Sequence, residues 1–132
     1  MKQQIEDTLS NLLKANSSLH KAIEATPRSD LIVSAIIKNF EFNFELSWKA
    51  MRRLLLHHGV SSASPRQAIA ESFRKEFINN ETTWLSMIED RNLTVHTYNE
   101  VFAREMTDRI SRLYLTEFDA FLSRLQLEVA AL

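Results

Sequence analysis

The chain has 132 residues, of which 45% are hydrophobic and 25% charged, and these values fit one globular domain rather than a disordered chain. Lysines and arginines number 16 against 17 aspartates and glutamates, so the formal net charge of -1 gives no overall basic field that would attract nucleic acid. One glycine, two prolines and no cysteine argue against a turn-rich β fold and exclude disulfides and thiolate metal sites.

The N-terminal segment MKQQIEDTLS lacks the apolar core of a signal peptide, and the longest apolar run, LIVSAII, is too short to cross a bilayer. We therefore expect a cytoplasmic protein with no membrane partner. A first amphipathic helix is predicted from about Gln3 to Ala25 by the spacing of Ile5, Leu9, Leu12, Leu13, Leu19 and Ile23. Pro27 ends it, and Ser29 or Asp30 can cap the next helix.

The second segment, Asp30 to His58, contains FEFNFELSW, which alternates like a strand. No helix breaker lies between Pro27 and Gly59, and a strand of that length would be unusual, so we predict a helix that ends at Gly59. Phe42 and Leu46 lie on nearly the opposite side from a first apolar face made by Ile36, Phe40, Phe44, Trp48, Met51 and Leu55. Such a helix is central, covered by helices on both flanks or by a second subunit.

Three more helices come after it in the prediction. Ser64 as cap, Pro65 and Gln67 form a capping-box start for a short helix whose apolar side is Ala68, Ile69 and Phe73, with Phe77 as a further candidate. A fourth helix begins around Trp84, Met87 and Ile88. A long last helix is marked by Phe102, Met106, Ile110, Leu113, Phe118, Phe121, Leu125 and Val129. The prediction is a single all-α domain over residues 1–132, an antiparallel bundle of about five helices.

The segment DRNLTVHTYNE, between the fourth and fifth helices, gathers four versatile polar residues, Arg91, Asn92, His96 and Tyr98. On one continuous helix, Arg91 and His96 would lie about 140° apart around the axis, too far to serve one ligand. Either the helix breaks between them, with Thr97 capping the next helix, or two chains pair this segment across a symmetry axis. A solvated turn with no function is the alternative.

The spacing of the segment, Arg91, four residues, His96, one residue, Tyr98, resembles the signature of the HEPN superfamily of small helical proteins. Asn92 after the arginine, and the tyrosine two residues after the histidine, resemble the HEPN toxins that are paired with minimal nucleotidyltransferase antitoxins. FEFNFELSWKAMRRLL and WLSMIEDRNLTVHTY also resemble the branch described as nucleotidyltransferase substrate-binding proteins. The likeness covers nearly the whole chain.

The resemblance implies a homodimer whose active site forms where two subunits meet, and a minimal nucleotidyltransferase as partner. It implies a metal-independent endoribonuclease, with no cofactor, in which Arg91 and His96 are catalytic. Histidine transfers protons near neutral pH and arginine can clamp a phosphate. Asn92 could orient the phosphate or the imidazole, and Glu89 and Asp90 could hold Arg91 in place. Tyr98 is the expected site of AMP attachment, or else packs on the last helix.

A second basic group lies on the predicted second helix. Lys49, Arg53 and His57 succeed one another at spacings of four, and are the expected phosphate-binding stripe if the protein binds RNA. Cations near a helix C-terminus are also favoured by the helix dipole alone. Two hypotheses remain open on the sequence: a toxin-like ribonuclease controlled by a nucleotidyltransferase, and a non-catalytic subunit that presents a substrate or nucleotide to that enzyme.

Overall fold

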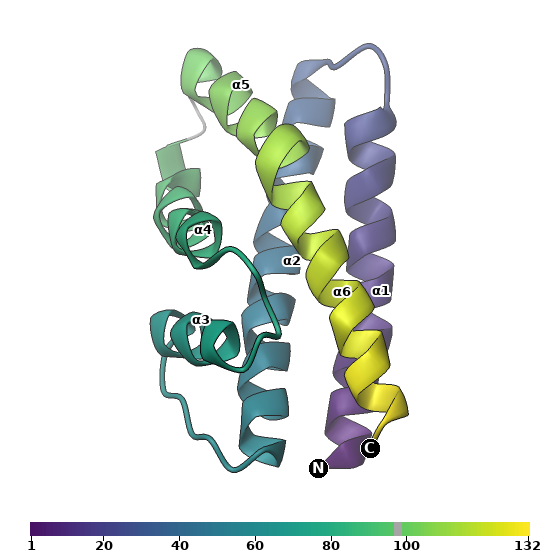
Figure 1. Cartoon of the computed structure of the whole chain (residues 1–132). Helices are drawn as coiled ribbons and strands as arrows, with labels where there is room; N and C mark the ends of the chain where they lie inside the picture. Colours follow the sequence, from purple (N-terminus) through teal and green to yellow (C-terminus); the bar gives the residue numbers. More distant parts are fainter. Residues whose placement is uncertain (97–98) are drawn as a thin grey trace.

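The computed structural model describes residues 1–96 and 99–132. Every regular element within those ranges is helical, as Figure 1 shows: α1 (Lys2–Glu24), α2 (Asp30–His57), α3 (Pro65–Arg74), α4 (Glu81–Leu93), the 3₁₀ turn η1 (Thr94–His96), α5 (Glu100–Arg109), the π turn η2 (Ile110–Tyr114) and α6 (Leu115–Ala130). Because α5, η2 and α6 form one continuous helix, the predicted all-α bundle of about five helices is confirmed. None of these helices is long and apolar enough to span a bilayer.

Local sequence signals set the bounds of α2. The hydroxyl of Ser29 accepts a hydrogen bond of 3.3 Å from the Ile32 N–H, which confirms Ser29 as the cap. At the other end Gly59 adopts a φ of 81°, the left-handed conformation that glycine takes without steric cost. The Val60 N–H then reaches back to the Leu55 carbonyl over 2.9 Å, which closes the helix.

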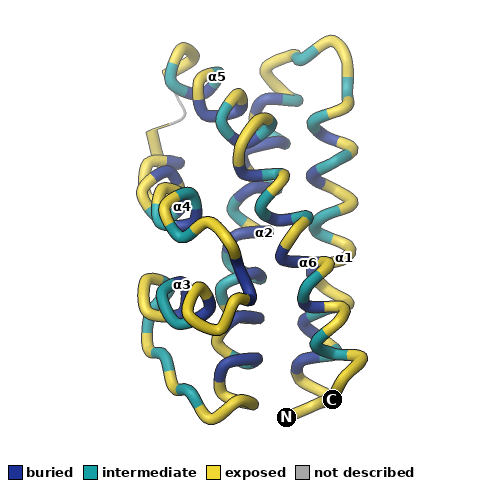
Figure 2. Tube along the Cα trace, viewed as in Figure 1, coloured by how far each residue is buried: buried dark blue, intermediate teal, exposed yellow. Residues whose placement is uncertain are grey.

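The helix α2 is the central element of the bundle, and it contacts α1, α3, α4, α5, η2 and α6. It runs antiparallel to α1, while α3 and α4 lie on its other side and α6 crosses the pair obliquely (Figure 1). FEFNFELSW is helical, as expected: Phe40 and Phe44 are buried, whereas Phe42 on the opposite side is 51% exposed. Figure 2 shows the same division between buried and exposed positions along α2. Trp48, predicted to be on the buried face, is only partly buried.

The assignment of Phe73 to the core is wrong, because this side chain is 42% exposed. The helix α3 ends at Arg74, one turn before its apolar stripe would continue. Glu76 has a φ of 63°, and the Phe77 N–H bonds back to the Ser72 carbonyl over 2.9 Å. This reversal folds Phe77 into the core in place of Phe73.

The π turn changes which residue of the last helix enters the core. The Leu115 N–H bonds to the Ile110 carbonyl five residues back, which adds one residue to that turn. As a result Leu113, predicted to be buried, is 53% exposed, and Tyr114 is buried instead. The Tyr114 ring stacks on Phe40 with 5.4 Å between ring centroids. A regular helical repeat therefore fails at this one position.

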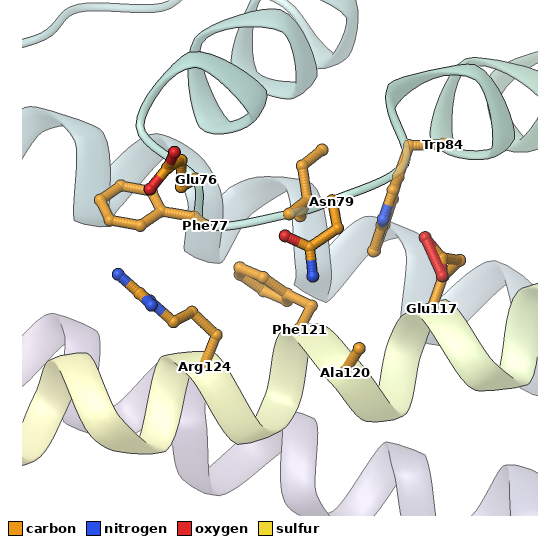
Figure 3. A pocket seen from close by; sticks show the side chains of 9 residues that line it. Glu76, Phe77, Asn79, Trp84, Glu117, Ala120, Phe121 and Arg124 are labelled. Carbon is orange, nitrogen blue, oxygen red and sulfur yellow. The ribbon is translucent and has the colours of Figure 1, made fainter.

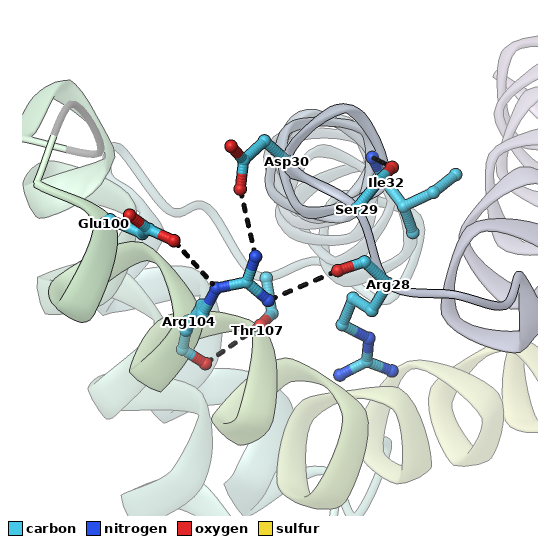
Figure 4. A network of polar contacts seen from close by, with 7 residues as sticks. All are labelled: Arg28, Ser29, Asp30, Ile32, Glu100, Arg104 and Thr107. Atoms are coloured by element: carbon cyan, nitrogen blue, oxygen red, sulfur yellow. Dashed lines mark hydrogen bonds and ion pairs between the residues drawn. The ribbon is translucent and has the colours of Figure 1, made fainter.

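The start of α5 is fastened to the turn between α1 and α2 by Arg104, as Figure 4 shows. Its guanidinium donates to the Arg28 carbonyl over 3.2 Å and to the Asp30 carboxylate over 2.9 Å, and it lies 3.5 Å from the carboxylate of Glu100. These bonds fix one end of the segment that joins α4 to α5.

Candidate functional site

The helical path is interrupted between Arg91 and His96, as the first of the two sequence alternatives requires. The helix α4 ends at Leu93, and the Thr94 hydroxyl donates to the Arg91 carbonyl over 2.8 Å. The 3₁₀ turn then carries the chain to His96. A 3₁₀ turn has about 3.0 residues per turn instead of about 3.6, so the angle of about 140° expected for a continuous α-helix no longer applies to Arg91 and His96. We call residues 91–96 the joint.

The cap of α5 differs from the prediction. Asn99 accepts the Phe102 N–H over 3.1 Å, so the helix begins at Glu100. Thr97, the expected cap, lies outside the described residues, and so does Tyr98, the expected site of modification.

The Arg91 side chain pairs with Glu45 of α2, not with either carboxylate beside it in sequence. Glu45 is also held by the indole N–H of Trp48, which donates to its second oxygen over 3.1 Å. The expectation that Glu89 or Asp90 holds Arg91 is therefore wrong: consecutive residues of a helix point in different directions, and Arg91 points to α2. The Arg91 side chain is 43% exposed, so part of the guanidinium remains available to a ligand.

Asn92 and His96 are both exposed, as is Arg91. The joint therefore presents a cation, an amide and an imidazole to solvent within six residues of chain. These groups can bind a phosphate, orient it and transfer a proton. No three histidine, aspartate or glutamate residues of the described ranges come together as a group able to hold a metal ion.

Beneath the joint lies a polar network that the sequence prediction missed. The carboxylate of Asp90, which is 7% exposed, accepts two hydrogen bonds from the Arg109 guanidinium, of 2.8 and 2.9 Å. It also accepts the Tyr114 hydroxyl at 2.5 Å. Burial and the bond to Asp90 raise the pKa of Tyr114 above its ordinary value. The bond to Asp90 likewise raises the pKa of Arg109.

Part of this network left a signal in the sequence. Tyr114 lies four residues after Ile110 and four before Phe118, in register with the core, and Leu113 took its place in the predicted stripe only by spacing from Ile110. Arg109 left no such signal, because residues five apart share a helix face only around a π turn.

The basic stripe of α2 is divided by the fold. Lys49 is exposed, as a phosphate-binding residue should be. Arg53 instead turns toward α1, where its guanidinium donates to the Thr8 hydroxyl and, over 3.2 Å, to the Gln4 carbonyl. Arg53 therefore links α2 to α1, apart from its predicted role in binding RNA. The substrate-binding roles of Lys49 and Arg53 stay predictions.

A separate hollow lies between the α3–α4 connection and α6, away from the joint (Figure 3). Its volume is about 100 Å³, room for a few water molecules and too small for a nucleotide. Among the residues that line it, the Arg124 guanidinium lies 5.9 Å from the centre of the Phe77 ring. Glu117 also lines the hollow, and burial raises the pKa of its carboxyl. The joint, which exposes a cation, an amide and an imidazole close together in the chain, is the better candidate site.

Comparison with known proteins identifies the family and the fold of the chain. A family model described as nucleotidyltransferase substrate binding protein like matches residues 7–127. The probable ribonuclease HepT of Haemophilus influenzae is 29% identical over 76 residues. That alignment spans 54% of this chain and 52% of the relative, about half the length of each.

Two solved structures have the same fold. A Haemophilus influenzae protein, described as revealing the fold of a substrate binding domain of a nucleotidyltransferase, is 25% identical with a TM-score of 0.79, over 89% of this chain and 98% of that one. A tri-AMPylated HEPN toxin of Shewanella oneidensis, in complex with an MNT antitoxin, is 13% identical with a TM-score of 0.76, over 93% and 96% of the two chains. At that identity the second likeness shows the fold alone.

Proposed function

The chain belongs to the nucleotidyltransferase substrate-binding protein family of the HEPN superfamily, and from this we propose that it is the partner of a minimal nucleotidyltransferase and a metal-independent endoribonuclease. The observation that carries the proposal is the joint, where Arg91 and His96 flank a break in the helix and are both exposed. Its test is RNA cleavage by the purified chain, set against variants of these two residues.

The chemistry assigned to the joint is attack of a ribose 2′-oxygen on the adjacent phosphorus. His96 as neutral imidazole takes the 2′-hydroxyl proton while the new P–O bond forms. The bond from phosphorus to the 5′-oxygen breaks, and that oxygen takes a proton from the partner subunit's His96. Arg91 holds the oxygens on which charge develops, and it must leave Glu45 at least in part to do so.

A homodimer would supply the second histidine, and exposed apolar side chains support it. Val95 lies within the joint itself, Leu93 ends α4 and Val101 lies in the first turn of α5. Phe42 is one turn before Glu45 on α2, the helix that the joint contacts through Arg91. Large apolar side chains on one exposed region are typical of a protein interface. We propose that a second copy of the chain covers them and brings two joints together.

Val95→Glu and Phe42→Glu are expected to weaken the dimer and to leave the fold of each chain intact, because a charge would be buried at the interface but not within one chain. Sedimentation velocity at micromolar concentration measures this. Leu127→Glu is the matched control, since Leu127 is also an exposed apolar residue but lies near the end of α6. A monomeric wild type, or variants that dimerise as tightly as Leu127→Glu, would contradict the proposal.

The partner proposal concerns Tyr98, two residues after His96. We expect co-expression with an active minimal nucleotidyltransferase to attach AMP to Tyr98 and to suppress cleavage, because each phosphate adds negative charge beside a phosphate-binding site. Intact-mass and peptide mass spectrometry locate the adduct. Tyr98→Phe should carry no adduct and should stay active in the presence of the partner. An active partner that leaves Tyr98 unmodified would favour a non-catalytic function.

That alternative is a subunit that presents a substrate or a nucleotide to the nucleotidyltransferase. Two observations favour it: the net charge of -1 provides no general attraction for RNA, and Glu45 forms an ion pair with the Arg91 guanidinium. Under this function the joint would bind a phosphate group without cleaving it. Wild-type protein that leaves RNA intact, yet binds the nucleotidyltransferase, is the result that would select it.

A further inference from the structure

The Asp90 carboxylate joins the two helical segments that enclose the joint. It belongs to the last turns of α4, and its three hydrogen bonds come from Arg109 at the end of α5 and Tyr114 at the end of the π turn. Both carboxylate oxygens are occupied, and Asp90 and Tyr114 are buried. Charge-assisted bonds of this kind, one of them bidentate, fix orientation as well as distance.

The network depends on the π turn. In a regular α-helix, Arg109 and Tyr114 would point about 140° apart and could not meet one carboxylate. The extra residue in the turn, closed by the bond from Leu115 to Ile110, brings both side chains to Asp90. Single π turns cost helical regularity and are frequent at functional sites. Here the π turn allows Arg109 and Tyr114 to donate hydrogen bonds to the same carboxylate, that of Asp90.

Asp90, which Arg109 and Tyr114 hold through these hydrogen bonds, is the residue directly before Arg91. The Thr94 hydroxyl bonds to the Arg91 carbonyl, so the start of the 3₁₀ turn is tied to the same helix end that Asp90 anchors. The joint is therefore held on its α4 side by Asp90, and on its α5 side by Arg104 and by the helix that carries Arg109. A loose α4 end would let Arg91 and His96 change their relative placement.

We propose that Asp90, Arg109 and Tyr114 are positioning residues, which set the Arg91 guanidinium relative to the His96 imidazole. The inference rests on the proposed function for its catalytic consequence, but the placement of the joint can be measured without activity. None of the three needs to touch RNA. They act by fixing the end of α4, and misplacement of catalytic groups by about 1 Å can cost about 100-fold in rate.

The test compares two deletions of a buried, hydrogen-bonded hydroxyl. Tyr114→Phe removes the bond to Asp90 and keeps the ring that stacks on Phe40. Thr8→Val is the control: it removes an equally buried hydroxyl of α1 at the far end of the bundle, which donates to the Gln4 carbonyl and accepts from Arg53, and it keeps the side-chain shape. We expect Tyr114→Phe to lower kcat about 10- to 100-fold with KM nearly unchanged. We expect Thr8→Val to keep the wild-type kcat, because any change at its partner Arg53 would alter RNA binding and therefore KM. Arg109→Lys, which retains charge but not the two-bond geometry, should fall between.

A readout other than activity separates this inference from the proposed function. In ¹H–¹⁵N spectra, Tyr114→Phe should shift the amide signals of residues 91–96 and the ring signals of His96, and Thr8→Val should not. The positioning role is wrong if the NMR signals of the joint are the same in Tyr114→Phe as in Thr8→Val. It is also wrong if wild type cleaves RNA and the two variants have the same kcat. If wild type does not cleave RNA while the joint signals shift as expected, the ribonuclease proposal fails and the positioning of the joint stands.

Discussion

Arg91→Ala and His96→Ala are each expected to lower the rate of RNA cleavage by about 100- to 10,000-fold, the range that a lost proton-transfer group typically costs. Both residues act as charge develops at phosphorus, so their loss should lower turnover more than binding. The measurement is a time course on total RNA with the purified chain alone. A loss of only a few-fold at His96 would be too small for a proton-transfer role.

Neither substitution should unfold the protein. His96 is exposed, and the pair between Arg91 and Glu45 is partly exposed on both sides. Ion pairs of that kind contribute about 0–1 kcal/mol to the free energy of unfolding. Thermal denaturation of the variants beside wild type checks this, so that a loss of cleavage can be assigned to chemistry. His20→Ala is the matched histidine control, because His20 lies on α1, where it bonds to Asp119, outside both the joint and the basic stripe of α2.

The same time course should be unaffected by EDTA, because the proposed mechanism uses only arginine and histidine. If cleavage stops in EDTA, the reaction needs a divalent metal ion and the roles assigned to His96 and Arg91 must change. If wild type and His96→Ala both leave the RNA intact, the joint is to be reinterpreted as a ligand-binding or interface segment.

Much of the fold can be predicted from the long stretches of sequence that contain no helix breaker. FEFNFELSW alternates like a strand, but the uninterrupted stretch from Pro27 to Gly59 decides for a helix, and the structure agrees. Two of the errors occur where the backbone departs from a regular repeat. The predicted burial of Phe73 is wrong because the chain reverses at Glu76, and the predicted burial of Leu113 is wrong because a π turn adds a residue to the helix. A periodic pattern assumes a constant angle per residue and cannot register either event.

The candidate site, like the fold, can be predicted only in part from the sequence. Arg91 and His96 could be singled out by spacing, and the break between them by its β-branched residues. Their partners could not, because Glu45 lies 46 positions before Arg91 and reaches it only through packing of α4 on α2. Asp90, adjacent to Arg91 in sequence, binds Arg109 instead. Neighbours in sequence are poor guides to ion pairs on a helix, since consecutive side chains diverge.

Asp90→Ala is expected to lower the free energy of unfolding by about 3 kcal/mol, more than any single change within the joint. Removing one partner of a buried ion pair costs about 3–5 kcal/mol, because the other charge is left without compensation. The low end applies because the Arg109 side chain keeps about a third of its surface in solvent. Urea denaturation measures the loss. Tyr114→Phe, which removes one hydrogen bond to a charged group, should cost about 1.5–3 kcal/mol.

A double-mutant cycle and a pH series make the assignment specific. Once Asp90 is alanine, Tyr114→Phe should cost much less than in wild type, since the hydroxyl has lost its acceptor. The pKa of Tyr114 is raised in the folded chain, so the stability it confers is complete below the ordinary tyrosine pKa of about 10 and is lost as the pH rises above it. The gap in unfolding free energy between wild type and Tyr114→Phe should therefore narrow above pH 10. A constant gap there, or additive effects in the cycle, would show that Asp90 and Tyr114 act independently.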